Sequence, residues 1–81
     1  MHSEILIHEG DLARHRHEQY DAVYLVDWQA AQRVPVRLPA LVPVPTDQGP
    51  AELRMQHLLI VVAEPHDPLT MRSVRRLLAL E

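Results

Sequence analysis

Hydrophobic residues along this chain fall into short runs that predict strands, and the strongest run lies near the C-terminus. Residues 58–63, LLIVVA, are continuously apolar and rich in β-branched side chains, and Glu64-Pro65 ends the run. An apolar run of this length is typical of a strand that is buried on both faces of a sheet. Polar and apolar positions alternate just before it, so we expect one long strand over 52–63; a helical turn over residues 50–56 is the alternative.

After this strand the hydrophobic pattern changes from the period of a strand to that of a helix. Asp67 is suited to cap a helix, and Pro68 suits its first position, because proline has no amide hydrogen to leave unpaired. The apolar face that follows consists of Met71, Val74, Leu77 and Leu78. We therefore expect a C-terminal amphipathic helix that packs on one face of the sheet.

Three earlier segments also have the pattern of strands. Residues 3–8 are apolar at their centre, and residues 21–28 are apolar on both faces, with Trp28 among the residues of one face. Residues 33–38 alternate cleanly between apolar and polar positions. Because Pro35 cannot donate a hydrogen bond to a neighbouring strand, we expect this third segment at an edge of the sheet.

The segments between these strands are expected to be a short helix, a turn and a loop. Residues 11–19 fit a short exposed helix, although an extended conformation also fits their pattern, and residues 29–32 fit a turn. Residues 39–50 contain four prolines and predict a long Pro-rich loop. The order of elements indicates a single α+β domain over residues 1–81, a small, mostly antiparallel sheet of about four strands with the C-terminal helix packed on one face. The other face is left to residues 11–19 or to a second subunit.

Composition narrows the classes of protein to which the chain can belong. It has 81 residues and no cysteine, which excludes disulfides, thiolate zinc sites and cysteine nucleophiles. Only two glycines are present, which excludes a glycine-rich phosphate loop, and we expect neither an enzyme nor a cofactor. The net charge of −3 argues against non-specific nucleic-acid binding. We see no signal or transmembrane pattern and expect a cytoplasmic protein, and the absence of Lys, Asn, Phe and Cys indicates a GC-rich bacterial source.

The histidine-rich segment provides one candidate site, for a divalent metal. On a helix, Asp11, His15 and Glu18 fall on one face at positions i, i+4 and i+7, where nitrogen and oxygen ligands could hold the ion. In an extended segment, His15 and His17 project to the same side instead. The candidate ligands are therefore His15, His17, Asp11 and Glu18. A solvated polar segment at the surface is the simpler interpretation.

The arginines provide a second candidate, a surface for a protein or nucleic-acid partner. They lie on the exposed face of the last helix and on the outer face of one expected strand: Arg72, Arg75, Arg76, Arg33 and Arg37. Guanidinium groups bind phosphates and carboxylates through forked hydrogen bonds. The simpler interpretation is a polar helix face in a protein that contains no lysine.

A third cluster lies at the end of the apolar strand, where Glu64, His66 and Asp67 stand close together in the sequence. Residues at strand ends of this kind form binding sites in parallel sheets. A mostly antiparallel sheet removes that argument, and capping of the last helix already explains Asp67. We therefore assign no role to this cluster from the sequence.

The leading functional hypothesis is a small non-enzymatic interaction or regulatory module that presents a sheet edge or a helix to a protein partner. A chain of this length buries only about 60–65% of its unfolded surface, so we also expect a homodimer that covers the open sheet face. A nucleic-acid-binding regulator with an arginine-rich helix face is the alternative hypothesis. A histidine-dependent metal-binding protein is the third.

Overall fold

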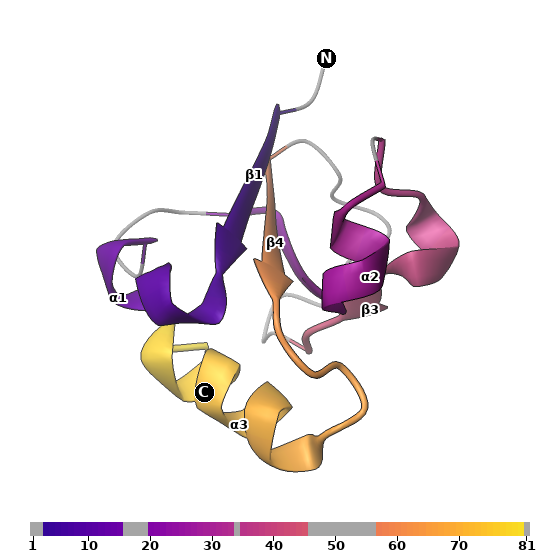
Figure 1. The fold of residues 1–81 in the computed structure, drawn as a ribbon. Helices are drawn as coiled ribbons and strands as arrows, with labels where there is room; N and C mark the ends of the chain where they lie inside the picture. The colour runs from indigo at the N-terminus through magenta and orange to yellow at the C-terminus, as the bar shows by residue number, and fades with distance from the viewer. Residues whose placement is uncertain (1–2, 16–19, 34, 46–56, 81) are drawn as a thin grey trace.

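The computed structural model describes residues 3–15, 20–33, 35–45 and 57–80, which form a small α+β domain with a four-stranded sheet (Figure 1). The strands are β1 (Ser3–His8), β2 (Ala22–Val26), β3 (Val42–Pro43) and β4 (His57–Val62). Their order across the sheet is β1-β4-β2-β3. The helices are α1 (Leu12–His15), α2 (Trp28–Ala31) and α3 (Pro68–Leu77), with the 3-10 turns η1 (Glu9–Asp11) and η2 (Leu38–Ala40).

The sheet is mixed, so the expectation of a mostly antiparallel sheet is wrong. β1 and β2 both run parallel to β4, and the two-residue β3 pairs with β2 in the antiparallel direction. All five residues of β2 and the four central residues of β4 are buried. A parallel strand in the middle of a sheet is covered on both faces, and this is why its sequence is continuously apolar. The apolar runs in the sequence were therefore evidence for parallel pairing.

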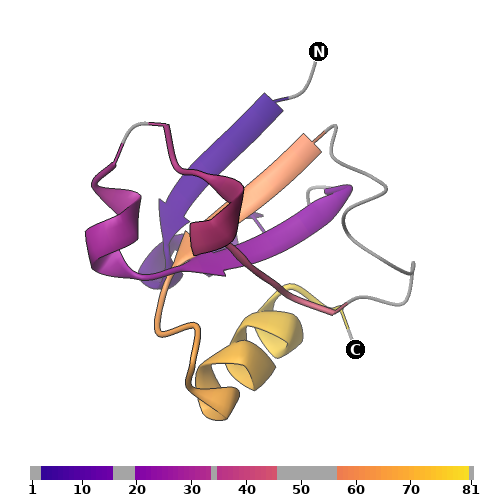
Figure 2. The same ribbon diagram turned by 90° about the vertical axis from the view of Figure 1, so that its right-hand side faces the viewer.

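Helical elements cover both faces of the sheet (Figures 1 and 2). α1 and α3 lie on what we call the first face, where Leu12 and Val74 are buried in one core with strand residues. α2 and η2 lie on the second face, where Leu41, just after η2, packs on a smaller buried cluster that includes Tyr24 and Leu58. Residues 11–15 therefore lie on the same face as the C-terminal helix, and they do not cover the opposite face.

α3 confirms the expected C-terminal helix and its N-terminal cap. The Asp67 carboxylate accepts hydrogen bonds from the Leu69 N–H at 3.0 Å and from the Thr70 hydroxyl at 3.2 Å. Pro68 occupies the first turn, where its missing N–H leaves no donor unpaired. The change from strand to helix is thus specified locally by residues 67 and 68.

The buried face of α3 is narrower than the sequence predicts. Val74 is 1% exposed and Leu78 is 7% exposed, and both belong to the core of the first face. Met71 packs half-buried against the same core. Leu77, expected on this face, is 46% exposed and does not belong to this core.

Two expected elements between the strands take other forms. Residues 33–38 do not form the expected edge strand; the described part of this segment leads from α2 into η2, and β3 is the antiparallel edge strand. Pro35 and Pro39 lack the N–H groups that a paired strand would need. The expected turn at 29–32 lies largely within α2, whose N-cap Asp27 accepts a hydrogen bond from the Ala30 N–H at 2.7 Å.

Part of the expected long strand, the Pro-rich loop and the expected helix lies outside the described residues. The strand is described from His57 onward, the loop up to residue 45 and the helix up to His15. Within the part of the chain that is described, none of the helices combines the length and the apolar character that spanning a bilayer requires.

Candidate functional site

The five candidate arginines lie on opposite sides of the sheet. Arg72, Arg75 and Arg76 are on α3, over the first face, whereas Arg33 and Arg37 lie between α2 and η2, on the side of the second face. Arg72 and Arg76 are exposed, but Arg75 is half-buried. The Arg75 Nε is buried and has no hydrogen-bond partner among the described residues. The three arginines of α3 therefore lie together, and Arg33 and Arg37 lie together, but the five arginines do not form one surface.

Arg33 and Arg37 share a pocket of about 360 Å³, whose walls also include Ala30, Pro35 and Ala40. The backbone N–H of Arg33 donates to the Ala30 carbonyl at 3.0 Å, and the N–H of Ala40 donates to the Arg37 carbonyl at 2.9 Å. These bonds fix the backbone at both arginines. Both side chains are exposed, so two cationic groups lie beside one hollow. The sequence predicted that these arginines share a face, although as part of a strand.

The candidate metal ligands are described only in part. Asp11 lies in η1 and His15 in α1, whereas His17 and Glu18 lie outside the described residues. The Nδ1 atom of His15 is 3.1 Å from the Tyr20 hydroxyl, within hydrogen-bond distance. In the described ranges, no group of three or more His, Asp or Glu side chains is placed to hold a metal ion. The metal site stays a prediction.

Tyr20 also belongs to a network at the N-terminal ends of β2 and β4. Its ring stacks on His57, with ring centroids 5.0 Å apart and 11° between the planes. The Asp21 carboxylate accepts a hydrogen bond from the His57 N–H at 2.8 Å, and the Asp21 N–H donates to the His57 carbonyl at 2.8 Å. This double link sets the register in which β2 and β4 pair, beginning at Ala22 and Leu58. We assign the network a structural role.

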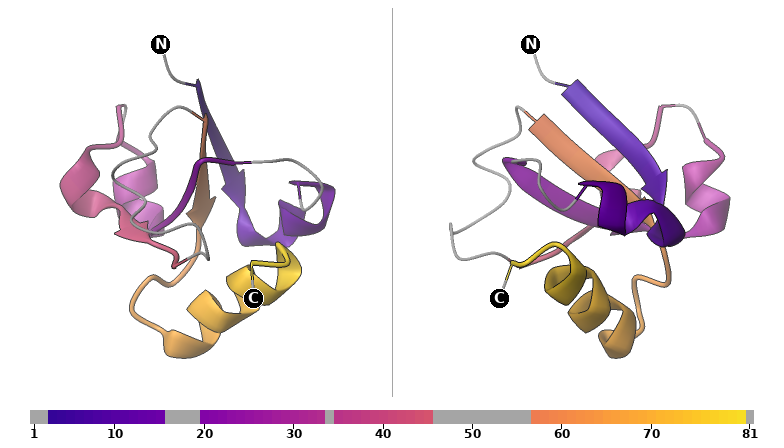
Figure 3. Two further views of the ribbon diagram at one scale, coloured as in Figure 1. Left: turned by 180° about the vertical axis from the view of Figure 1, so that it is seen from behind. Right: turned by 90° about the vertical axis from the view of Figure 1, so that its left-hand side faces the viewer.

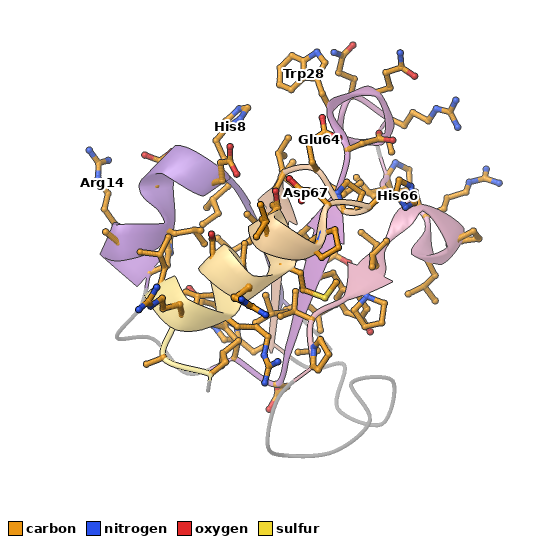
Figure 4. The ribbon with its side chains drawn as sticks, turned by 90° about the horizontal axis from the view of Figure 1, so that it is seen from below. His8, Arg14, Trp28, Glu64, His66 and Asp67 are labelled. Carbon is orange, nitrogen blue, oxygen red and sulfur yellow. The ribbon has the colours of Figure 1, made fainter. Side chains whose placement is uncertain are left out.

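At the opposite ends of the parallel strands, a group of polar and aromatic side chains gathers (Figure 4). Ligands often bind at the carboxyl ends of strands in open parallel sheets, so the parallel pairing restores interest in this cluster. The rings of His8 and Trp28 are in contact there, with centroids 5.5 Å apart and 33° between the planes. Glu64 and His66 are exposed, and Asp67 caps α3.

Trp28 is a surface residue that the sequence interpretation placed wrongly. It was expected on a largely buried strand, but it is the first residue of α2 and is 58% exposed. Asp27 ends the strand because its side chain caps α2. The Asp27-Trp28 pair was a usable signal, since an N-cap residue after an apolar run indicates that a helix begins.

β1 forms an open edge of the sheet. It pairs with β4 on one side in an unbroken register, from Ser3 opposite His57 to His8 opposite Val62. Among the described residues no strand pairs with its other side, and Figure 3 shows β1 along the border of the sheet. Proteins usually protect such edges with charged side chains, proline, bulges or a covering segment, and Glu4 is the one exposed carboxylate that β1 carries, at its N-terminal end. The centre of β1 is Ile-Leu-Ile, with an even register and no such residue.

The opposite edge of the sheet is protected. β3 has two residues, one of which is Pro43, and Pro45 follows soon after. Proline has no N–H group to donate to a further strand, and a very short edge strand offers few pairing sites. Of the two edges described, β1 alone presents an uninterrupted run of backbone N–H and C=O groups.

Beside the open edge, Leu6, His8 and Trp28 form an exposed group that we call the β1 patch. Leu6 and His8 share the second face of β1, because strand side chains alternate, and Leu6 is 50% exposed. Trp28 extends the patch through its contact with His8. Exposed aromatic side chains such as Trp28 are enriched at the centre of protein interfaces.

The open edge of β1 and the β1 patch are therefore the candidate interaction site. The sequence signal that could have found it is an apolar strand without lysine, proline or glycine, combined with a protected strand elsewhere. Comparison with protein-family models, with curated proteins and with solved structures yields no match to this chain, so the site is interpreted from its own residues.

Proposed function

We propose that this chain is a non-enzymatic interaction module whose working surface is the edge of β1. The observation that supports the proposal most is the contrast between the two edges of the sheet. The β3 edge is short and contains proline, whereas the six residues of β1 contain no proline and have an apolar centre. An unprotected apolar edge promotes association, so it is retained where association is useful.

The proposed mode of binding is the addition of a strand from a protein partner to the sheet. Backbone hydrogen bonds along β1 supply affinity, and side chains on the two faces supply specificity. On the second face, the partner would cover Leu6, which is half exposed in the isolated chain. On the first face, it would extend the core at Ile5, which is only partly buried.

Replacing Leu6 by lysine should prevent this association. A charge in the middle of an edge strand opposes the addition of a further strand, and we expect affinity to fall by about tenfold or more. Because Leu6 is 50% exposed, the free energy of unfolding should change by only about 0.5 kcal/mol. The measurements are sedimentation velocity of the purified chain and affinity capture of partners from cells of the native source.

The matched control is Leu69→Lys, which makes the same change at a 69% exposed position on α3. This variant should retain every association of the wild-type chain. Circular dichroism verifies that both variants fold. A folded Leu6→Lys variant that keeps the wild-type associations would show that the β1 edge is not the interaction surface.

As a second candidate function, we propose that the Arg33–Arg37 pocket binds a small phosphate- or carboxylate-bearing ligand. Its volume of about 360 Å³ is that of a small-molecule site, and guanidinium groups offer forked donors to such anions. The separation of the five arginines onto two sides of the sheet favours a small ligand over an extended nucleic acid.

Pyrophosphate should raise the melting temperature of the wild-type chain but not that of the double variant Arg33→Gln/Arg37→Gln. Ligand at one hundred times its Kd adds about 2.7 kcal/mol to the free energy of unfolding, so saturating concentrations give a clear shift. Arg72→Gln, at an exposed arginine on α3, is the control and should keep the shift. An equal rise in the double variant would place the anion elsewhere.

A further inference from the structure

We propose that the strand added to β1 is the β1 strand of a second copy of this chain, paired antiparallel about a twofold axis at Leu6. The inference rests on the proposed use of the β1 edge and names its partner and register. Its basis is the sequence of residues 4–8, Glu-Ile-Leu-Ile-His, which is self-complementary when read in opposite directions.

In this register each side chain meets a suitable neighbour. Glu4 lies opposite the partner's His8, Ile5 lies opposite the partner's Ile7, and Leu6 lies opposite the partner's Leu6. Apolar pairs across strands are stabilising, and the Glu4 carboxylate can accept a hydrogen bond from a ring N–H of the partner's His8. Because of the twofold symmetry, the pair of Glu4 with the partner's His8 occurs twice in the dimer. Glu4, Leu6 and His8 share the second face and the two isoleucines share the first, so every pair lies on one face.

Other registers of the same arrangement are less complementary. A twofold axis perpendicular to the sheet passes through one residue and pairs residues of equal parity, so the smallest shifts of register move the axis to Ile5 or to Ile7. An axis at Ile5 places Glu4 opposite the partner's Leu6. An axis at Ile7 places His8 opposite the partner's Leu6. Each opposes a polar group to an aliphatic one, and only the axis at Leu6 pairs acid with imidazole.

The β1 patch fits this assembly. The half-exposed Leu6 would be covered by the partner's Leu6 on the second face. His8 contacts Trp28 within its own chain, so its imidazole would lie between an aromatic ring and the partner's Glu4. An exposed tryptophan next to the edge thereby gains a role in holding His8 for the cross-strand pair.

The proposed dimer also leaves no sheet edge to which a further chain could add. Two four-stranded sheets joined at β1 make one continuous sheet of eight strands, whose two outer strands are both β3. Those edges are short and contain Pro43, so they do not add further strands. A twofold dimer is therefore the end point, as in most homo-oligomers, and the chain would not polymerise through its sheet.

Cysteine substitution tests the axis directly, because the chain contains no cysteine. Antiparallel neighbours have Cα atoms about 4.5–5.5 Å apart, within the range that a disulfide spans. The Leu6→Cys variant of the full chain should therefore form an intermolecular disulfide under mild oxidation, read by intact mass. Leu69→Cys, at an exposed position on α3, should form little intermolecular disulfide at the same concentration.

The register has its own test. Glu4→Cys and His8→Cys should each fail to cross-link alone, and a mixture of the two should cross-link. Efficient cross-linking of Glu4→Cys with itself would overturn the register. Exchange of charge provides a second readout: Glu4→Lys and His8→Glu should each weaken the dimer about tenfold, and mixing them should restore it.

The outcomes separate this inference from the proposed function. If the wild-type chain is a monomer while Leu6→Lys still abolishes capture of a different protein, the self-pairing is wrong and the use of the β1 edge stands. If the chain is a dimer that Leu6→Lys leaves intact, Leu6→Cys cross-links no faster than Leu69→Cys, and Leu6→Lys also keeps every captured partner, both proposals fail. A dimer that Leu6→Lys dissociates and Leu6→Cys traps supports both.

Discussion

Replacing Leu59 by alanine is expected to lower the free energy of unfolding by about 2–5 kcal/mol. Leu59 is fully buried in β4, the strand that pairs with both β1 and β2. It lies opposite Ile5 on one side and Val23 on the other, and both belong to the core of the first face or pack against it. The substitution leaves a cavity where two strands and the helical layer meet.

This loss is large relative to the total free energy of unfolding of the domain. At roughly 0.05–0.15 kcal/mol per residue, a domain of this size has a free energy of unfolding of about 4–12 kcal/mol. Urea unfolding followed by circular dichroism measures the loss. Leu69→Ala makes the same change at a 69% exposed position and should cost far less. Equal losses in the two variants would contradict the placement of β4 at the centre of the sheet.

The second large effect is expected at the contact between α3 and the sheet. Val74 is 1% exposed, and the core around it offers no buried polar or charged side chain among the described residues. Aspartate at this position would be an unpaired buried charge, which costs about 3–5 kcal/mol. We expect α3 to detach or the domain to unfold, with a melting temperature lowered by many degrees.

Ser73→Asp is the matched control, because Ser73 is the preceding residue on α3 and is exposed. Its melting temperature should stay close to that of the wild-type chain, as for most surface substitutions. Amide hydrogen exchange adds a local measurement, since loss of docking should expose the helix first. Similar melting temperatures for the two variants would show that α3 does not pack through Val74.

Local chemistry explains which parts of the fold the sequence could predict. β4 and α3 follow from an apolar run, an Asp67 cap and a helical period, each of which acts within a few residues. Strand direction is different, because alternation of side chains is the same in parallel and antiparallel pairs. The long segments between β1 and β2 and between β2 and β4 leave room for parallel crossovers. The lengths of these segments, and strands that are apolar on both faces, were the evidence for parallel pairing that the sequence contained.

The candidate site was harder to predict for a related reason. An edge exists only once the order of strands is known, and the last strand in the chain lies between the first and the second. Leu6 therefore lies on an edge strand because β4 is inserted between β1 and β2. No local pattern in residues 3–8 indicates this position. The sequence placed Arg33 and Arg37 on one face of a strand, whereas the pocket that both line depends on η2, which replaces the expected strand.

The position of β4 also has a consequence during synthesis. Ser3 pairs with His57 and His8 with Val62, so β1 has no neighbour in the sheet until residues 57–62 have left the ribosome. Until then, both borders of β1 and one border of β2 are open, and the two strands cannot pair with each other in their final places. Pairing over such long separations is slow and leaves apolar strands exposed to other chains. Nascent copies made close together on one messenger RNA could therefore meet through β1 before either has completed its own sheet.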